Sequence, residues 1–541
     1  MSIQRFGQLN VRHMQEIIAC KYHYRRPLHS INGDLIMQKP DSDRNPPTQL
    51  TRRVVLKQMA LGTLGVLTIP HFGIGKSLEG QVESQEKVTG LLIRNGLIVN
   101  ADGRREGDVL IRGDKIVEIG RDLPAPANGR IIDAKGLQVL PGGIDPHVHL
   151  SRPWVDDLTS GSMAALAGGI TTLGLMSGLS KGETIIDMLD RNTATIREQA
   201  ITDFMIHSIV WNPTKEIIEH LPLLASAGQP SIKIFMMSEH FDKKTSEFLS
   251  ILELARGEKI LPMIHCEDRA ILEAAKNVLL AKGQKSLKYY AASRPTSAEM
   301  IATQKAIALC EAIGVPMYFV HLSCESALRA CADAQARNLP IYVETRPLYL
   351  HMTSERFQNA DGPIYVGQPP LRQASDVAAL WRGLASGAIH TMGTDHAPWT
   401  REQKLDPTLD ITKLRPGVNN LQVMLPMLYS EGVLGGRITL ERFVTVTSTN
   451  AAKLFGMYPR KGKVAVGSDA DIALWDPGAT RSVRAEDGFS KAGFSIYEGW
   501  KVVGWPLVTI RRGEVVYENQ QIKGRPGSGQ LISRNRWNEF D

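Results

Sequence analysis

Between residues 140 and 398 the chain repeats one pattern that limits its fold more than any other feature. Short runs of Ile, Val, Leu, Met and Phe alternate with longer segments of helical character, such as 182–199 and 297–314. Alternating strands and helices are typical of a parallel α/β fold. Eight such runs predict a (β/α)8 barrel, and they span residues 140–150, 170–177, 203–210, 231–238, 259–267, 316–323, 340–345 and 390–398.

The segments on either side of the barrel have a different residue pattern. From about residue 88, and again from about 461 to 520, apolar and polar residues alternate between turns such as Asn-Gly, Asp-Gly and Gly-Asp, a pattern typical of β-hairpins. We interpret the two flanks as one small β-sandwich domain built from both ends of the mature chain. The predicted segments are a leader at 1–78, a first β-sandwich segment at 79–140, the barrel at 141–457, a second β-sandwich segment at 458–520 and a C-terminal tail at 521–541.

The net charge is concentrated in the leader. Residues 1–78 hold eleven Lys and Arg against four Asp and Glu, which accounts for the whole net charge of +7, while the rest holds 52 basic and 52 acidic residues. A neutral body gives no reason to expect a nucleic-acid partner. The five cysteines have no spacing typical of a disulfide framework or a zinc knuckle.

Residues 51–70, TRRVVLKQMALGTLGVLTIP, place a pair of arginines before a short apolar stretch. This segment resembles a twin-arginine export signal, and its apolar stretch is too short to span a bilayer permanently. The resemblance implies recognition by the twin-arginine export machinery and a periplasmic or exported protein. The alternatives are a buried or amphipathic helix and a cytoplasmic protein, and Met37 is an alternative start.

Side chains that bind metals or carry charge recur at the ends of the predicted strands. In GGIDPHVHL two histidines lie two residues apart, so both point to one face of a strand. Each such residue alone has an ordinary structural explanation, for example a packed histidine or a lysine paired with a carboxylate. The carboxyl ends of barrel strands form one rim, however, so we expect convergence of His147, His149, Lys233, His265, His321 and Asp395.

This set of residues indicates a metal site. Four imidazoles and a carboxylate suit zinc or a similar divalent ion, although ligand type does not choose among zinc, manganese, cobalt and iron. A lysine ammonium is not a ligand, so Lys233 needs a separate explanation. Burying six polar groups without partners would cost roughly several kcal/mol each, which favours a shared function.

The order of these residues, with the motifs around them, resembles the amidohydrolase superfamily in its hydantoinase, dihydropyrimidinase, allantoinase and dihydroorotase branch. The resemblance covers nearly all of residues 88–520. It rests on GxDxHxH, on Thr-Asp-His-Ala-Pro, and on the segments 164–172, 293–299, 344–350, 368–372 and 448–477.

The resemblance implies two divalent cations, with zinc as the expected metal, bridged by an N6-carboxylated Lys233. A hydroxide shared by the two cations would attack a C–N amide bond of a small cyclic amide. Asp395 would be the catalytic residue that moves the proton to the leaving nitrogen. The family also implies a homo-oligomer, a dimer or tetramer. The implied ligands are His147, His149 and Asp395 on one metal, and His265 and His321 on the other.

The substrate side departs from every one of these branches. Ser238 stands where hydantoinases carry a tyrosine, and Gln368 where they carry a serine. Arg152 lies one place after the position of the arginine that binds the carboxylate in dihydroorotases, which disfavours dihydroorotate. We expect a hydantoin, dihydropyrimidine, allantoin or imide-like ring. The candidate substrate contacts, which could equally be ordinary polar surface residues, are Arg152, Ser238, Gln368 and Asn419.

Two other functions stay open at this point. The first is an N-acyl amino-acid deacylase or dipeptidase that acts on a linear amide with the same barrel. The second is a non-catalytic assembly protein of the same fold. Retention of all six ligand positions disfavours the second, because function depends on the site rather than on the fold.

Overall fold

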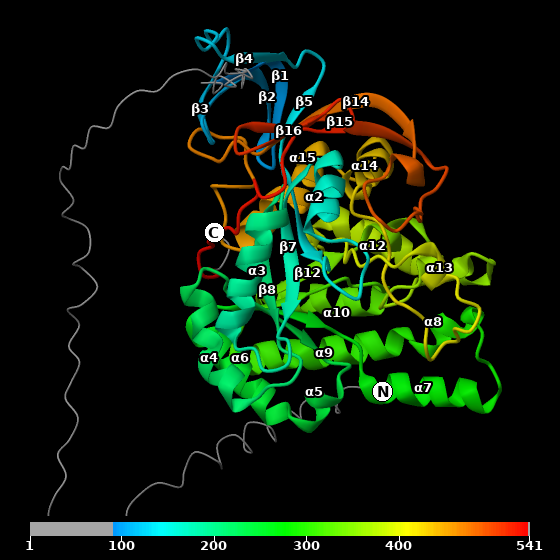
Figure 1. Ribbon diagram of the computed structural model, residues 1–541. Helices are drawn as coiled ribbons and strands as arrows, with labels where there is room; N and C mark the ends of the chain where they lie inside the picture. Colours follow the sequence, from blue (N-terminus) through cyan, green and yellow to red (C-terminus); the bar gives the residue numbers. More distant parts are fainter. Residues whose placement is uncertain (1–89, 539–541) are drawn as a thin grey trace, which may run out of the picture. The chain divides into compact units, whose positions relative to one another are not determined.

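The computed structural model describes residues 90–538 (Figure 1). The predicted export signal lies outside these residues. Two β-sheets organise the described chain, one of eight parallel strands and one of nine strands.

The eight-stranded sheet is a nearly closed barrel. Its strands follow one another in chain order, and its two ends meet where Val148 forms a parallel bridge with His396 and the His149 N–H donates to the His396 carbonyl at 2.8 Å. Each predicted barrel strand contains one observed strand, which confirms the fold class. The strands are β6 (Gly143–Val148), β7 (Ile170–Gly178), β8 (Asp203–Ile209), β9 (Ser231–Phe235), β10 (Leu261–His265), β11 (Met317–Phe319), β12 (Ile341–Thr345) and β13 (Thr391–Met392).

Helices connect successive barrel strands (Figure 1). The segments predicted at 182–199 and 297–314 form α3 and α9, and α9 ends at Gly314, whose φ of +72° is left-handed and suits glycine. The helices are α2 (Leu158–Ala167), α3 (Ile185–Gln199), α4 (Lys215–Ser226), α5 (Glu239–Lys243), α6 (Thr245–Glu258), α7 (Arg269–Ala281), α8 (Tyr290–Ser293), α9 (Thr296–Ile313), α10 (Glu325–Ala336), α11 (Pro347–His351), α12 (Ala374–Ser386), α13 (Arg401–Lys404), α14 (Met424–Leu428), α15 (Leu440–Val444) and α16 (Asn450–Leu454). Shorter helical turns are η1 (Leu287–Tyr289), η2 (Ser354–Gln358), η3 (Gly362–Tyr365), η4 (Tyr429–Leu434), η5 (Thr445–Thr449) and η6 (Ala485–Asp487).

The barrel strands are apolar on both faces, which explains their continuous apolar runs in the sequence. Side chains such as Met205, Met263 and Tyr318 belong to one buried cluster, whereas Phe204 and Ile264 belong to the large cluster that includes the helices. Burial on both faces leaves little room for polar side chains along the strands. The polar residues that remain are concentrated near the strand ends.

The nine-stranded sheet combines strands from both flanks of the barrel. Its order is β17-β16-β15-β14-β5-β1-β2-β3, with β4 beside β1, and β5 pairs with β14 so that Val139 lies opposite Leu474. This confirms a β-domain assembled from both ends of the described chain; the domain boundaries stay predictions. The strands are β1 (Leu91–Asn100), β2 (Gly103–Arg112), β3 (Lys115–Gly120), β4 (Arg130–Asp133), β5 (Gln138–Pro141), β14 (Ile472–Ser482), β15 (Lys501–Arg511), β16 (Glu514–Glu518) and β17 (Gln521–Ile522).

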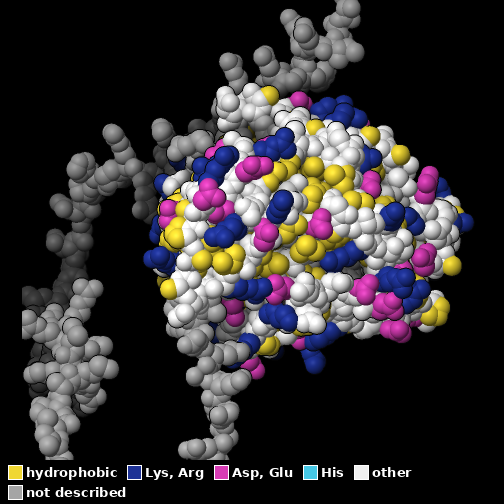
Figure 2. Space-filling model, turned by 90° about the horizontal axis from the view of Figure 1, so that it is seen from above, with side chains coloured by type: hydrophobic (Ala, Val, Ile, Leu, Met, Phe, Trp, Pro, Cys, Tyr) yellow, Lys and Arg dark blue, Asp and Glu magenta, His cyan; other side chains and the backbone are white. Residues whose placement is uncertain are grey.

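Figure 2 shows the face of the molecule on the side of this sheet. Acidic and basic side chains are interspersed across that face, with apolar side chains between them. No single sign of charge dominates it, as the balanced composition of the body predicts.

After β17 the chain returns to the barrel. The Phe204 N–H donates to the Gln530 carbonyl, and the buried Arg534 donates to the Ile206 carbonyl and to Ser231 Oγ, both at 2.9 Å. The tail therefore packs against β8 and β9. Within the described residues of the chain, no helix has both the length and the apolar character needed to cross a bilayer.

Candidate metal centre

All six predicted ligand residues line one hollow. They come from the carboxyl ends of five barrel strands, where a (β/α)8 barrel forms its active site. All are buried except Asp395, which is half-buried. His147 lies in β6 and His149 directly after it. The other residues are Lys233 of β9, His265 of β10, His321 after β11 and Asp395 after β13.

His147, His149 and Asp395 form the first group. The Nε2 atoms of the two histidines lie 3.3 and 3.1 Å from Asp395 Oδ1. Two ligands of one tetrahedral zinc ion, each about 2.0–2.1 Å from the metal, are roughly 3.4 Å apart. The spacing of these three donor atoms therefore fits a shared cation.

His265 and His321 form the second group, with His265 Nδ1 3.0 Å from His321 Nε2. Lys233 lies next to the first group, since its Nζ is 3.5 Å from His147 Nε2. Among residues 90–538, no carboxylate forms an ion pair with Lys233, although its side chain is fully buried. The ordinary explanation offered from the sequence, a lysine paired with a carboxylate, therefore does not account for Lys233.

Burial keeps the imidazoles of His147, His265 and His321 neutral. Together with the nearby Lys233, it holds the pKa values of His147 and His321 well below the usual range, and it also lowers the pKa of His265. Burial lowers the pKa of Lys233 to about 8. Neutral imidazole is the form of histidine that binds metal ions, so the electrostatics and the geometry agree.

Glu344 of β12 supports both groups of ligands. Its Oε1 accepts from His147 Nδ1 and from the His321 N–H, each at 2.9 Å, and its Oε2 accepts from the Tyr318 hydroxyl at 2.8 Å. A carboxylate on the far nitrogen of a ligand histidine fixes its ring and its tautomer. Burial raises the pKa of Glu344 to about 7.

Arg346 holds the loop that carries Asp395. Its Nε donates to the Thr394 carbonyl at 3.0 Å, and its Nη1 lies 3.1 Å from Asp395 Oδ2. Burial alone would raise the pKa of Asp395, but Arg346 and the two histidines bring it well below its usual range. Asp395 is therefore held as a carboxylate with Oδ1 toward the histidines and Oδ2 toward the guanidinium.

Glu267 plays for His265 the role that Glu344 plays for His147. Its Oε2 lies 2.9 Å from His265 Nε2, and Arg294 pairs with the same carboxylate. The sequence analysis did not single out Glu267, Glu344 or Arg346. The two-residue period of a strand could have indicated them, because residues two apart point to the same face. Glu267 lies two residues after His265, and Arg346 lies two residues after Glu344.

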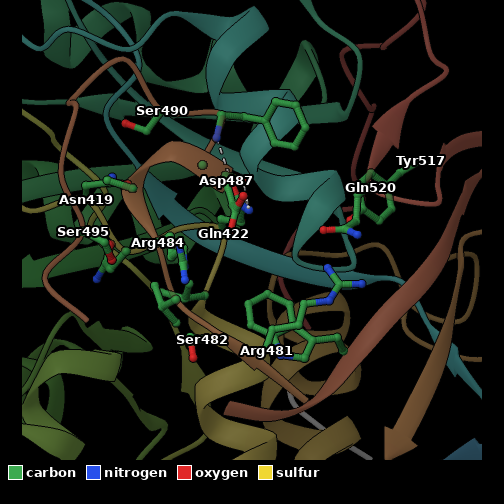
Figure 3. Close-up of a pocket in the computed structure, with 17 residues that line it drawn as sticks. Asn419, Gln422, Arg481, Ser482, Arg484, Asp487, Ser490, Ser495, Tyr517 and Gln520 are labelled. Carbon is green, nitrogen blue, oxygen red and sulfur yellow. Dashed lines mark hydrogen bonds between the residues drawn. The ribbon is translucent and has the colours of Figure 1, made fainter. Parts of the chain in front are cut away.

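The four predicted substrate contacts lie in different places. Gln368 lines the hollow, whereas Arg152 is exposed and does not line it. Ser238 is buried and caps α5, where its Oγ accepts from the Phe241 N–H at 3.1 Å. Asn419 lines a separate cavity between residues 419–423 and 481–490 (Figure 3). Its side-chain amide donates to the Phe494 carbonyl at 2.7 Å.

Aromatic side chains line the hollow beside the ligands. The Trp154 ring lies 4.6 Å from the His149 ring, and the Trp211 ring lies 5.2 Å from that of Phe235. The sequence analysis did not predict these walls, since nothing in a single sequence places loop residues 154 and 211 over the same site. The hollow therefore combines a polar floor with partly apolar walls.

The model of the amidohydrolase family matches residues 138–516. The chain belongs to the amidohydrolase family. It is 36% identical to a D-hydantoinase of Geobacillus stearothermophilus over 458 residues, which cover 82% of this chain and 97% of the relative, and 34% identical to a dihydropyrimidinase of Rattus norvegicus, covering 83% and 90%. The crystal structure of a dihydropyrimidinase from Brevibacillus agri superposes with a TM-score of 0.80 at 35% identity, covering 83% of this chain and all of that one.

These relatives confirm the predicted superfamily and its hydantoinase and dihydropyrimidinase branch. A divalent metal is also supported, because the chain combines membership of the amidohydrolase family with a cluster of His147, His149 and Asp395. The identity of the metal and the carboxylation of Lys233 go beyond this support.

Proposed function

We propose that this amidohydrolase hydrolyses a C–N amide bond of a cyclic amide, such as a hydantoin, dihydropyrimidine, allantoin or imide-like ring, with the help of two divalent cations. The observation that carries the proposal is the convergence of six ligand-type side chains on one hollow at the carboxyl ends of the barrel strands. The names of the relatives, D-hydantoinase and dihydropyrimidinase, support the choice of a cyclic amide.

The metal ligands in this proposal are His147, His149 and Asp395 for one cation, and His265 and His321 for the other, with zinc as the expected metal. Divalent cations supply Lewis acidity toward a carbonyl and lower the pKa of a bound water. We assign Lys233 the bridge between the two sites, after carboxylation of its Nζ by carbon dioxide. Its full burial beside His147 and its lack of a carboxylate partner among the described residues support this assignment.

Asp395 is the catalytic residue of the proposal. Its carboxylate accepts a proton from the attacking water and passes it to the leaving ring nitrogen, which does not depart readily as an anion. Arg346 and the histidines fix the carboxylate between them, so it is oriented before the substrate enters. Such orientation reduces the entropy lost on reaching the transition state.

Gln368 is the proposed substrate contact with the best support, because it lines the hollow. Its side-chain amide offers both a donor and an acceptor, which matches the alternating N–H and C=O groups of a cyclic ureide. The roles of Arg152, Ser238 and Asn419 in substrate binding stay predictions.

We also propose that the protein is exported through the twin-arginine route, on the basis of residues 51–70, and that it acts in the periplasm or outside the cell as a dimer or tetramer. The twin arginine and the short apolar stretch support export. The oligomer is a family expectation only.

A substrate panel tests the reaction. The purified, metal-loaded protein is offered hydantoin, dihydrouracil, allantoin, dihydroorotate, phthalimide and N-acetylated amino acids. We expect ring opening of at least one cyclic amide other than dihydroorotate. Turnover of the linear amides alone would replace the proposal by a deacylase, and protein without bound metal or turnover would favour a non-catalytic role.

A further inference from the structure

A buried network of ion pairs and hydrogen bonds lies behind the second group of ligands, His265 and His321. Its members do not line the hollow of the metal centre. Two of them come from segment 293–299 and one from segment 368–372, and the proposed function gives no role to these three. We call the following residues the arginine network: Glu267 after β10, Arg294 after α8, Glu299 of α9, Ser323 after β11 and Arg372 before α12.

One branch of the arginine network fixes the ring of His265. Glu267 Oε2 lies 2.9 Å from His265 Nε2, and Arg294 Nε donates to Glu267 Oε1 at 3.0 Å. A carboxylate beside Nε2 keeps the proton on that nitrogen and leaves the lone pair of Nδ1 for a cation. Nδ1 is also the atom that faces His321 Nε2 at 3.0 Å, so this branch sets the tautomer that the second metal site requires.

The other branch holds the backbone next to His321. The φ of His321 is +41°, in the left-handed region that is unfavourable for a residue with a side chain. Such a conformation persists only where the surrounding contacts hold it. Two residues further on, the Ser323 N–H donates to Glu299 Oε1 at 2.7 Å, and the Ser323 hydroxyl donates to Glu299 Oε2. Glu299 is therefore one of the groups that keep this segment in place.

Arg372 joins the two branches. Its Nε donates to Ser323 Oγ at 2.9 Å, its Nη2 to Glu299 Oε2 at 2.8 Å, and its Nη1 to the Arg294 carbonyl. Each nitrogen of the guanidinium thus has a different acceptor, which a planar fork of donors makes possible. Arg372 is 5% exposed and Glu299 is 2% exposed, so solvent screens this ion pair little.

The first group of ligands has a separate support. Glu344 accepts from His147, and Arg346 pairs with Asp395. Glu344 is shared between the groups, because it also accepts from the His321 N–H. Loss of the arginine network should therefore affect the second group and leave the first in place.

We propose that Arg372 is a positioning residue for the second cation: it fixes His265 and His321 relative to each other, and without it this cation binds more weakly while the first stays bound. The inference rests on the proposed function, which assigns one cation to each group of ligands. It adds a role in metal binding for segments 293–299 and 368–372.

Zinc retention measures this role. The zinc-loaded full chain is equilibrated with increasing concentrations of a chelator, and the zinc that stays bound is measured by elemental analysis. We expect two zinc ions per chain in the wild type, and loss of one of them from Arg372→Met at an about tenfold lower chelator concentration. Tenfold is the lower end of the range for partners of metal ligands, because Arg372 acts through other residues. Arg372→Lys, which keeps the charge but not the fork, should lie between the two.

A second background shows which cation is affected. His321→Ala removes a ligand of the second group and should leave one zinc ion per chain. Arg372→Met added to His321→Ala should not change the affinity for this remaining ion. A further loss of affinity in the double variant would overturn the inference, and so would equal zinc retention by the wild type and Arg372→Met.

Two more variants separate positioning from stability. Glu299→Gln keeps the shape of the arginine network but removes a charge, and it should also lose the second zinc ion first, which keeps the test decisive if Arg372→Met does not fold. Arg511→Met is the matched control, since Arg511 of β15 is 2% exposed and pairs with Glu514 at 2.7 Å. It should destabilise the fold without changing the zinc bound to folded protein. The same zinc loss in Arg511→Met would overturn the inference.

Zinc binding also separates this inference from the proposed function. Two zinc ions in the wild type and one in Arg372→Met support the inference even if no cyclic amide is hydrolysed, an outcome that overturns the proposed reaction. Ring opening by a wild-type chain that binds a single zinc ion overturns the inference and leaves the hydrolysis of cyclic amides standing.

Discussion

Two buried lysines at opposite ends of the barrel have contrasting surroundings. Lys461 lies near the start of β8, and its Nζ pairs with Asp203 at 2.9 Å, with Asp469 at 3.4 Å and with Asp471. Lys233 lies near the end of β9, and its nearest polar partner is an imidazole nitrogen at 3.5 Å. Both are almost completely buried, so burial alone does not distinguish them.

The partners decide what each lysine does. Burial would lower the pKa of Lys461, but its three carboxylates raise it above the usual range, so the charged form is stabilised. Burial lowers the pKa of Lys233 to about 8. A buried polar group with a complete set of hydrogen-bonding or charged partners has a structural role. A buried polar group without such partners indicates a binding site for an ion or molecule that the chain does not supply.

Lys404 is an intermediate case. It has no carboxylate partner among the described residues, but its Nζ donates to three carbonyls, those of Val366, Arg415 and Gly417, at 2.8 to 2.9 Å. Every N–H of its ammonium group therefore has an acceptor. Two of these acceptors lie next to or within the wall of the metal hollow, since Gly417 lines it and Val366 precedes the lining residue Gln368 by two positions.

The largest effect is expected for the unpaired lysine. Lys233→Ala should lose bound metal and reduce kcat by more than about a thousandfold, because the chemistry depends on a water activated by the cations. Short carboxylic acids should partly restore both by replacing the bridge. Elemental analysis and steady-state kinetics measure the two effects. Unchanged metal content in Lys233→Ala would contradict the assigned bridge.

Lys461→Ala is expected to have the opposite profile. Removing one partner of a buried ion pair typically costs about 3 to 5 kcal/mol. In this variant Asp471 would stay buried without an ion-pair partner among the described residues, and Asp203 would keep only its pair with Arg512 at 3.2 Å. Denaturant unfolding should show this loss, while the metal content of the folded fraction stays the same. Loss of metal without loss of stability would contradict the contrast between the two lysines.

Lys404→Met tests the intermediate case. The variant removes the Lys404 donor from the carbonyls of Arg415 and Gly417, while the Val366 carbonyl still accepts from the Gly417 N–H at 2.9 Å. We expect a loss of about 3 kcal/mol in the free energy of unfolding. Because Gly417, one of these three residues, lines the hollow, KM should rise while metal content stays unchanged. Lys404→Arg, which keeps donors at this position, is the matched control. Equal KM values for wild type and Lys404→Met would show that the wall does not depend on this lysine.

The smallest effect concerns Asp156, a carboxylate with a complete set of partners. Burial would raise its pKa, but hydrogen bonds from His396, at 2.8 Å, and from Ser490 and Lys491 lower it to about 2. A lowered carboxyl pKa stabilises the fold above the unfolded value near 4, by about 2 kcal/mol, and this contribution disappears as the pH falls toward 2.

Comparison with Asp156→Asn makes this pH dependence measurable. The wild type should be more stable than Asp156→Asn at neutral pH, and the difference should shrink between about pH 4 and pH 2. Denaturant unfolding of both proteins over this range provides the measurement. A difference that does not depend on pH would mean that the carboxylate charge contributes nothing.

The sequence determined the barrel, the β-domain built from two flanks, and the convergence of the six candidate ligand residues on one rim. These follow from local rules: eight apolar runs are long enough to be strands, and a (β/α)8 barrel brings the carboxyl ends of its strands to one rim. His147, Lys233 and Asp395 could therefore be placed together although they lie far apart in the chain. The spacing of residues along a strand was sufficient for that inference.

Only the tertiary structure decided which polar residues support the ligands and which line the substrate space. The side chains of Glu344 and Arg346, in and just after β12, contact ligand residues that other strands carry. Trp211 reaches the site from a loop, where no periodic rule fixes the direction of a side chain. Asn419 faces a separate cavity for the same reason. The end of a strand fixes the position of a residue's backbone, but packing against distant segments decides what its side chain contacts.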